Sequence, residues 1–396
     1  MATDTAPAPA PVPSRASLVW IILPLIVLGA ALAWIFVSDP LQSFNNGAPP
    51  VEALTVERTI LDDAGIHLQV RAGGSDAMSI AQIQVDDAYW VFTQDPAGQL
   101  SRGATAWLNV PYPWVLGEAH HIVMLTNTGA AFEHTIDVAV PTPQADSNQL
   151  GAQAIVGAIV GLLPVAIGLM FYPALRGVGR KGMNFLLALT VGLLAFLLID
   201  MSEDALELAG ESAALFQGPA MVVFAAAASF LVLFAVGRFR GVPGGLALAY
   251  FIALGIGLHN LGEGLAIGAA FAAGAAGLGT FLVAGFAIHN VTEGIGIAAP
   301  ILKERPKLWH FAALAAVAGG PAIVGMWLGS LAQSPQWSAL ALAVGAGAIL
   351  QVIVEVGAYL IRSNQGNRTV LLTPGVIAGL IAGVAFMYVT AALIKV

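Results

Sequence analysis

The sequence of 396 residues contains no cysteine and only 15 lysine and arginine residues. Without cysteine the chain cannot form a disulfide, bind a metal through thiolate sulfur or use a cysteine nucleophile. The formal net charge is −8 and no long basic run exists, which excludes a nucleic-acid partner. A metal site must therefore use imidazole nitrogen and carboxylate, carboxamide or backbone oxygen, so the 7 histidines become informative.

Charged residues of either sign make up only 10% of the chain, against about 25% in a typical soluble domain. Hydrophobic residues account for 58%, and the mean hydropathy is +0.83. A soluble protein of this length would need far more polar surface, so the composition predicts a multi-pass α-helical membrane protein. The 45 glycines suit close contacts between helices in lipid.

The N-terminal region predicts a tail followed by an anchor. Residues 1–17 are rich in alanine and proline, which is typical of a disordered tail. Residues 18–37 form an apolar run long enough to cross a bilayer, and we interpret them as a transmembrane anchor. The stretch Ala31-Leu32-Ala33 resembles a cleavage site, so a signal peptide is the alternative, but the apolar run continues to Val37, which favours the anchor.

Residues 40–145 differ in character from the rest of the chain. Apolar and polar residues alternate in short runs such as 66–70, 80–85 and 121–125, separated by glycine, proline and aspartate. This spacing predicts about seven strands in a small all-β, immunoglobulin-like sandwich. The polar, proline-containing stretch 141–149 is typical of a linker, so we expect the sandwich to fold separately from the segment that follows.

The remainder of the chain, residues 150–396, consists of apolar segments separated by short polar loops. Each segment is long enough to span a bilayer. The predicted spans are 150–172, 183–199, 219–236, 245–272, 279–300, 309–332, 338–361 and 370–394. They predict an eight-helix membrane domain after the anchor and the sandwich.

In the loops between these spans, lysine and arginine occur only in alternate loops. They occur within 176–181, 238–240, 303–307 and 362–368, and the loops 200–218, 273–278 and 333–337 contain none. Because cytoplasmic loops carry the excess of lysine and arginine, the charged loops are predicted to be cytoplasmic. The sandwich and the C-terminus then lie outside the cell and the N-terminal tail inside, in a protein of the plasma membrane.

Two neighbouring spans carry the same polar motif, HNxxEG. It begins at His259 in one span and at His289 in the next, thirty residues later. An ionisable group inside a membrane is costly and is a functional candidate by default. The histidine and the glutamate of each motif are four residues apart and share one helix face, and the short loop between the spans makes the two helices antiparallel neighbours.

The doubled motif supplies ligands for a metal ion. Each helix offers one imidazole and one carboxylate, and the adjacent asparagine adds a carboxamide oxygen. Mixed nitrogen and oxygen ligands without sulfur suit Zn, Fe(II), Mn, Co or Cd. Hydrogen bonding between helices and a metal-free proton relay are the alternatives, but two identical sets at matched depth favour metal binding.

This pattern resembles the ZIP (Zrt/Irt-like) family of divalent-metal transporters, whose fourth and fifth helices carry HN-x-P-E-G-like motifs. The similarity continues through residues 293–300, and through 345–351 with Glu355 in the seventh helix. Eight helices with both ends outside is also the topology of the family. The resemblance covers about residues 150–396 and leaves out the anchor and the sandwich.

The resemblance implies inward transport of a divalent cation, with zinc as the first candidate and Fe, Mn, Co and Cd as further ones. It implies no enzymatic activity and no organic cofactor, and its partners are the metal ion, the lipid bilayer and a second copy in a homodimer. The implied transport site consists of His259, Asn260, Glu263, His289, Asn290 and Glu293.

The chain departs from the family pattern in three places. The motif prolines are replaced by Gly262 and Thr292, and the Glu-Pro pair of the sixth helix is replaced by Gly320-Pro321. A carboxylate expected at a second metal is therefore missing. Since two glutamates balance the charge of one divalent ion, we expect a site that holds mainly one ion, with a binuclear site as the alternative.

Further polar residues occur near both ends of the predicted route. Four acidic residues follow helical spacing at the outer end of the second span: Asp200, Glu203, Asp204 and Glu207. They predict either a solvated helix end or an entrance that concentrates cations. Gln351 and Glu355, in the seventh span, either pair with helix backbone or line the exit to the cytoplasm.

Two other functions would use the same residues. A sensor would bind a metal in the helices and report it through the sandwich. An intramembrane hydrolase would use the metal to activate water, but the sequence has no HExxH motif and no spare general base. Metal flux would distinguish transport from both.

Overall fold

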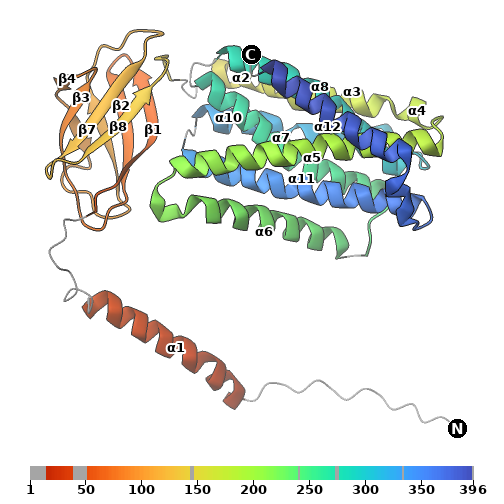
Figure 1. The fold of residues 1–396 in the computed structure, drawn as a ribbon, viewed down its shortest axis with the longest axis horizontal. Helices are drawn as coiled ribbons and strands as arrows, with labels where there is room; N and C mark the ends of the chain where they lie inside the picture. Colours follow the sequence, from red (N-terminus) through yellow and green to blue (C-terminus); the bar gives the residue numbers. More distant parts are fainter. Residues whose placement is uncertain are drawn as a thin grey trace. The chain divides into compact units, whose positions relative to one another are not determined.

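The computed structural model describes residues 15–38, 51–142, 147–239, 241–272, 276–331 and 334–394. Residues 1–50 and 51–396 form two compact units. In the first unit a single helix, α1 (Arg15–Ser38), contains the predicted anchor (Figure 1). The helix begins inside the predicted tail, whose residues 1–14 lie outside the described residues. Its side chains from 22 to 35 are apolar and exposed, as a helix that faces lipid requires.

The second unit begins with a sandwich of two four-stranded antiparallel sheets, in the orders β1-β2-β6-β5 and β4-β3-β7-β8. The strands are β1 (Leu54–Asp62), β2 (Gly65–Ala72), β3 (Ile80–Val85), β4 (Ala88–Trp90), β5 (Thr93–Asp95), β6 (Thr105–Val110), β7 (His120–Thr126) and β8 (Ala131–Ile136). Alternation along each strand builds the core, in which Ile66 and Leu68 of one sheet pack with Ile83 and Ile122 of the other. The predicted β domain is confirmed; its immunoglobulin-like connectivity stays a prediction.

Among the described residues after the sandwich, eight helical segments are long and apolar enough to cross a membrane, which confirms the predicted multi-pass domain. The first consists of α2 (Ser147–Gly157), the π-helical turn η2 (Ala158–Leu162), α3 (Leu163–Met170) and α4 (Tyr172–Leu175), and the sixth of α9 (Leu308–Gly319) and α10 (Pro321–Leu331). The others are α5 (Arg180–Glu211), α6 (Gly218–Arg238), α7 (Gly245–Ala272), α8 (Ala276–Ala298), α11 (Pro335–Ser363) and α12 (Pro374–Ile394). The second span is longer than predicted, because the acidic residues after position 199 continue the helix.

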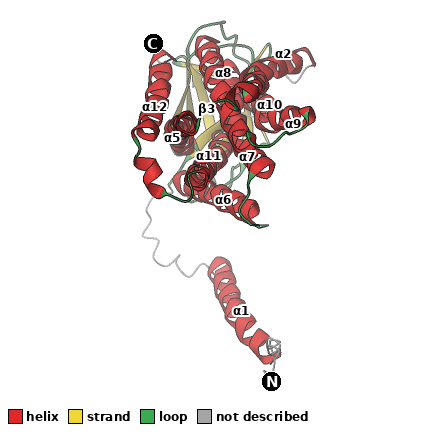
Figure 2. Ribbon diagram, turned by 90° about the vertical axis from the view of Figure 1, so that its right-hand side faces the viewer, coloured by secondary structure: helices red, strands yellow, loops and turns green. Residues whose placement is uncertain are grey.

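Close contacts at glycines divide the eight spans into two groups. A Cβ atom at Gly325 of α10 would lie 2.0 Å from a carbonyl oxygen of α7, and one at Gly168 of α3 would lie 2.1 Å from a carbonyl oxygen of α8. The same holds for Gly383 of α12 against α5, at 2.2 Å, and for Gly347 of α11 against α6, at 2.1 Å. We call the first span, α7, α8 and α9–α10 the motif group, and α5, α6, α11 and α12 the flanking group. Figure 2 shows the two groups side by side.

The sandwich contacts the flanking group through a buried charged network. Gln336, near the start of α11, donates a hydrogen bond from Nε2 to Oε1 of Glu57 in β1 at 2.9 Å. Arg71 of β2 pairs with Glu57 at 2.6 Å, and its guanidinium lies 5.2 Å from the ring centroid of Phe216, which precedes α6. The sandwich is thus joined to the helices by side chains as well as by the linker. Independent folding of the two parts stays a prediction, and linker residues 143–146 lie outside the described residues.

Candidate metal centre

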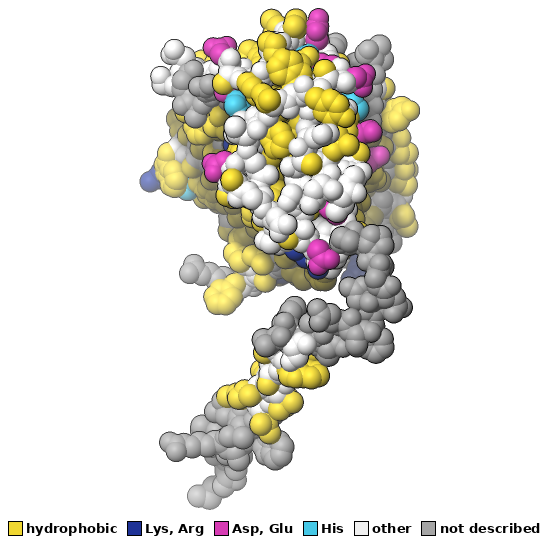
Figure 3. Space-filling model, turned by 90° about the vertical axis from the view of Figure 1, so that its left-hand side faces the viewer, with side chains coloured by type: hydrophobic (Ala, Val, Ile, Leu, Met, Phe, Trp, Pro, Cys, Tyr) yellow, Lys and Arg dark blue, Asp and Glu magenta, His cyan; other side chains and the backbone are white. Residues whose placement is uncertain are grey.

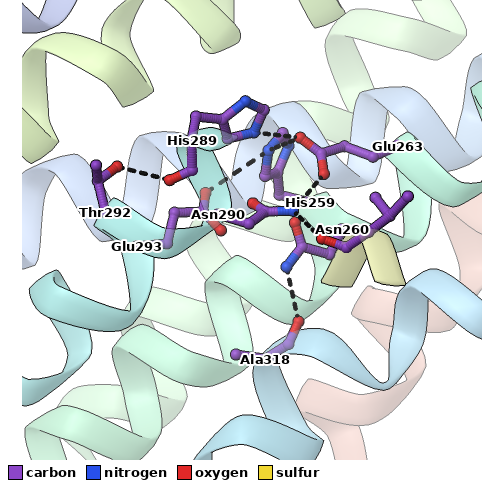
Figure 4. Close-up of polar contacts among 9 residues, drawn as sticks. His259, Asn260, Glu263, His289, Asn290, Thr292, Glu293 and Ala318 are labelled. Carbon is purple, nitrogen blue, oxygen red and sulfur yellow. Dashed lines mark hydrogen bonds and ion pairs between the residues drawn. The ribbon is translucent and has the colours of Figure 1, made fainter. Parts of the chain in front are cut away.

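The two HNxxEG motifs meet in the middle of the motif group. All six of the residues implied by the resemblance are buried, three from α7 and three from α8. Figure 4 shows the side chains of His259, Glu263, His289 and Glu293 gathered between these helices. Helical periodicity within each motif and the antiparallel contact between the helices therefore bring together groups that are far apart along the chain, as the spacing predicts.

Glu263 connects the two helices. Its Oε1 accepts a hydrogen bond from Nε2 of His289 at 2.6 Å, and its Oε2 accepts one from Nδ2 of Asn290 at 3.0 Å. The same Oε1 lies 2.9 Å from Nε2 of His259, but without the direction of a hydrogen bond, so we treat that contact as an ion pair. One carboxylate of α7 is thus shared by both imidazoles.

Three ligand atoms of the centre lie close enough to hold one ion. One nitrogen each of His259 and His289 and one carboxylate oxygen of Glu293 all lie within 4.8 Å of one another. Ligand atoms at about 2.0–2.2 Å from a zinc ion span comparable distances. Glu263 does not belong to this set of three but adjoins it through both imidazoles.

Several atoms of the centre are buried without a hydrogen-bonding partner. Across the described residues, neither carboxylate oxygen of Glu293 and neither ring nitrogen of His259 makes a hydrogen bond. Nε2 of His259 lies 3.8 Å from Oε1 of Glu293, and a contact of this length compensates a buried carboxylate poorly for its lost hydration. Imidazole nitrogen and carboxylate oxygen atoms that make no hydrogen bond are ligands that a borderline divalent cation prefers. The residues present therefore fit such an ion.

The two asparagines are oriented by breaks in neighbouring helices. Nδ2 of Asn290 donates to the Val160 carbonyl at 3.0 Å, within the π-helical turn, and the residue four positions on, Pro164, has no N–H to donate to this carbonyl. Nδ2 of Asn260 donates to the Ala318 carbonyl at 2.9 Å, in the last turn of α9 before Pro321 begins α10. Both carboxamide oxygens stay buried and unpartnered within the described structure, so they are further oxygen donors.

The break between α9 and α10 has no space for an additional side chain. A Cβ atom at Gly319 would lie 2.5 Å from backbone atoms of Gly161 and Leu162 in the first span. Since α9 and α10 contain no aspartate or glutamate, the carboxylate that the sequence lacks at Gly320 has no substitute from this helix. The mid-span prolines Pro164 and Pro321 are the sequence signal for these breaks. Neither break was predicted, and Pro321 was considered only beside Gly320, where the glutamate is missing.

The predicted entrance residues separate into two pairs. Asp200 and Asp204 of α5 line a small cavity of about 30 Å³ together with His259 and Glu263. Glu203 and Glu207 line a different depression, on another face of α5. The flanking group therefore brings two carboxylates beside the centre, on the side of α5 that faces it.

The predicted exit residues lie on α11, away from its sandwich end. Glu355 pairs with Arg238 at 3.1 Å rather than with helix backbone. Gln351 is buried, and neither amide atom has a hydrogen bond among the described residues. The pairing of Arg238 with Glu355 was not predicted, because Arg238 was interpreted only as one of the positive charges of a cytoplasmic loop.

Histidines of the sandwich are engaged in local contacts. His67 bonds Asn109 and Asp62, His120 bonds Asp86, and His134 bonds Thr59. Burial lowers the pKa of His134, which favours its neutral form. In the described part of the chain, the cluster of His259, His289 and Glu293 is the one group of three or more such residues close enough to hold a metal. Acidic side chains are scattered over the sandwich face in Figure 3 and form no single patch.

Comparison with protein-family models and with curated proteins found no match to this chain. The functional assignment therefore depends on the motifs and on the geometry of the centre.

Proposed function

We propose that this protein is a ZIP-like transporter that moves divalent cations, zinc first among them, into the cytoplasm through the centre between α7 and α8. The observation that carries the proposal is the buried cluster of His259, His289 and Glu293, in which a carboxylate and an imidazole lack hydrogen-bonding partners across the described residues. A divalent cation would satisfy these atoms and neutralise the carboxylates. The homodimer and the plasma-membrane location belong to the same proposal.

The direction of transport follows from the distribution of basic residues. The loops between helices that contain lysine and arginine lie at the end of the bundle remote from the sandwich (Figure 1), which is the cytoplasmic end by the positive-inside rule. Cations would then arrive on the sandwich side, where Asp200 and Asp204 line the cavity that reaches His259. Oxygen ligands at this position can replace water molecules one at a time before the ion reaches imidazole nitrogen.

Alternating access is the mechanism that suits a site at the midplane. Transporters of this type expose a fixed site to one side and then to the other as one group of helices moves against another. The motif group holds all six motif residues, and the flanking group supplies Asp200, Asp204 and Glu355 on either side of them. Release is aided by protonation, because imidazole and carboxylate ligands must be deprotonated to bind a metal.

The charge at the centre favours one tightly held ion. Glu263 and Glu293 together balance one divalent cation, and no carboxylate comes from the break at Gly319-Gly320. Zinc counting on purified, desalted protein should give about one tightly bound ion per chain. Two equally tight ions would support the binuclear alternative instead.

The decisive test of transport is metal uptake by proteoliposomes that contain the purified protein. Zinc should accumulate with the wild-type protein, and Glu263→Gln and Glu293→Gln should abolish the accumulation. Glu207→Gln is the matched control, since Glu207 lies on another face of α5. Uptake at the wild-type rate in either centre variant would refute the proposal.

A metal sensor is the second candidate, favoured by the contact of Gln336 with Glu57. Through this contact a change in α11 would reach β1 directly. A sensor would bind zinc at the centre and show no flux in the same proteoliposomes. No structural observation favours a hydrolase.

A further inference from the structure

A second buried polar cluster lies on α11, apart from the metal centre. Glu355 and Gln351 are each 1% exposed and four residues apart, so they share one helix face. Arg238, the last residue of α6, directs Nη2 and Nε to the same oxygen, Oε1 of Glu355, at 3.1 and 3.3 Å. Oε2 of Glu355 and both amide atoms of Gln351 have no hydrogen bond among the described residues. The arginine therefore satisfies only part of this cluster.

The cluster adjoins the centre on the side remote from the sandwich. A Cβ atom at Gly255 of α7 would lie 3.1 Å from Oε1 of Gln351. Gly255 precedes His259 by one helical turn, or about 6 Å along the helix axis. Glu355 lies one turn beyond Gln351, toward the end of α11 that is remote from the sandwich. An ion leaving the centre toward the cytoplasm would therefore meet Gln351 and then Glu355.

The three side chains differ in freedom to move. Glu355 and Gln351 are enclosed within the helices, whereas Arg238 lies at the end of its helix with a side chain that is 33% exposed. Its guanidinium lies over the ring of Phe234, at 4.3 Å from the centroid. The guanidinium makes this contact while it is paired with Glu355, so the ring can hold it when the carboxylate is taken by another cation, whereas a helix-bound carboxylate and carboxamide cannot move with it.

We propose that Gln351 and Glu355 form a transient second binding position for the transported cation, and that Arg238 is a tethered cation that fills this position between passages. An arriving divalent ion displaces the guanidinium from Glu355, and the returning guanidinium then displaces the ion toward the cytoplasm. This inference rests on the proposed transport function. It assigns Arg238 a positioning role, because the arginine acts on the ion through Glu355.

Zinc binding to the purified full-length protein tests the competition directly. In equilibrium dialysis the wild-type protein should bind one tight ion, and Arg238→Gln should bind a second ion at least about tenfold more tightly than the wild type does, within the usual range of coupling between sites. Arg238→Lys should behave like the wild type because it keeps the competing charge. The double variant Arg238→Gln/Glu355→Gln should lose the second ion again.

Uptake kinetics supply a readout that a structural role would not change in the same way. If the guanidinium expels the ion, Arg238→Gln should retain it, so that kcat and the apparent KM for zinc both fall. A folded Arg238→Gln protein with wild-type zinc stoichiometry and affinity would overturn the inference. If Arg238→Gln does not fold, Gln351→Glu in the wild-type background serves instead. Its added carboxylate should make the second ion measurable, and a folded Gln351→Glu protein without it would also overturn the inference.

The inference and the proposed function can fail separately. Glu293→Gln removes a ligand of the central ion and should leave the second ion of Arg238→Gln in place. Absence of a central ion from every protein with an intact Glu293 would reject the proposed function. Absence of the additional ion in Arg238→Gln, with the central ion present, would reject only the role of Arg238.

Discussion

The sandwich and the membrane helices partner their polar clusters in opposite ways. In the sandwich, Asp86 accepts hydrogen bonds from the Tyr112 hydroxyl at 2.7 Å, from the His120 ring at 2.8 Å and from the His121 amide at 2.9 Å. In the centre, Glu293 accepts none from the described residues. Because His120 is buried as His259 is, burial alone does not distinguish a functional histidine in this molecule. A buried polar group without a hydrogen-bonding partner does indicate function, since nearly all buried polar groups in proteins are paired.

The largest expected effect comes from replacing Glu293, whose buried carboxylate makes no hydrogen bond among the described residues. Glu293→Gln should lower zinc uptake about 100-fold or more, because it leaves a buried divalent ion short of one negative charge. In the presence of a chelator it should not lower the thermal midpoint, because the Glu293 oxygens have no hydrogen bond within the described structure to lose.

The comparison variant is Asp86→Asn, which disrupts the paired cluster. It should lower stability by about 1 kcal/mol for each weakened hydrogen bond and leave uptake unchanged. Uptake and thermal unfolding of both variants check the contrast. If Glu293→Gln lowered the stability of the metal-free protein and left zinc uptake normal, the contrast would be contradicted.

A second prediction concerns the packing that holds the motif group together. Gly325→Val should destabilise the helices by about 1–3 kcal/mol, because its side chain would collide with the backbone of α7. Gly357→Val is the matched control, since a Cβ atom at Gly357 of α11 meets nothing within 4 Å. Chemical unfolding of the two proteins in detergent should differ accordingly. Equal stability would mean that α7 and α10 are not in this close contact.

A third prediction separates the sandwich from transport. Deletion of residues 1–145 should leave a folded bundle that still takes up zinc, because every motif residue lies beyond position 258. Stability should fall by about 1–3 kcal/mol, since Gln336 then loses its bond to Glu57. The full-length Gln336→Ala protein measures the contribution of that bond alone. A well-folded bundle that carries no zinc at any concentration would show that the sandwich is part of the transport machinery.

The smallest expected effect is a pH dependence confined to the sandwich. The hydrogen bond to Asp86, followed by burial, raises the pKa of Tyr112 from 10.0 to about 12. Because the folded state holds this proton more tightly, the stability from this group is complete below pH 10 and is lost as the pH rises through about 12. Tyr112→Phe should remove that part of the alkaline loss in thermal midpoint and leave zinc uptake unchanged. An identical alkaline profile in the variant would contradict the assignment.

The sequence predicted the groups that local periodicity controls. The HNxxEG spacing placed His259 and Glu263 on one face, and alternation in residues 66–70 placed Ile66 and Leu68 in the sandwich core. The pairing of Asn290 with Val160, by contrast, depends on a carbonyl in the π-helical turn of a helix far away in sequence. The contacts of Arg238 with Glu355 and of Gln336 with Glu57 likewise join residues more than a hundred positions apart. Such contacts follow from the packing of helices and strands far apart in sequence, which a single sequence does not specify.

The most direct test of the central claim is to locate zinc in crystals of the full-length protein by anomalous scattering. The account predicts one strong peak between α7 and α8, coordinated by nitrogen atoms of His259 and His289 and by a carboxylate oxygen of Glu293. Zinc found only at sandwich histidines or on the protein surface, with this cluster unchanged and without a peak, would contradict it.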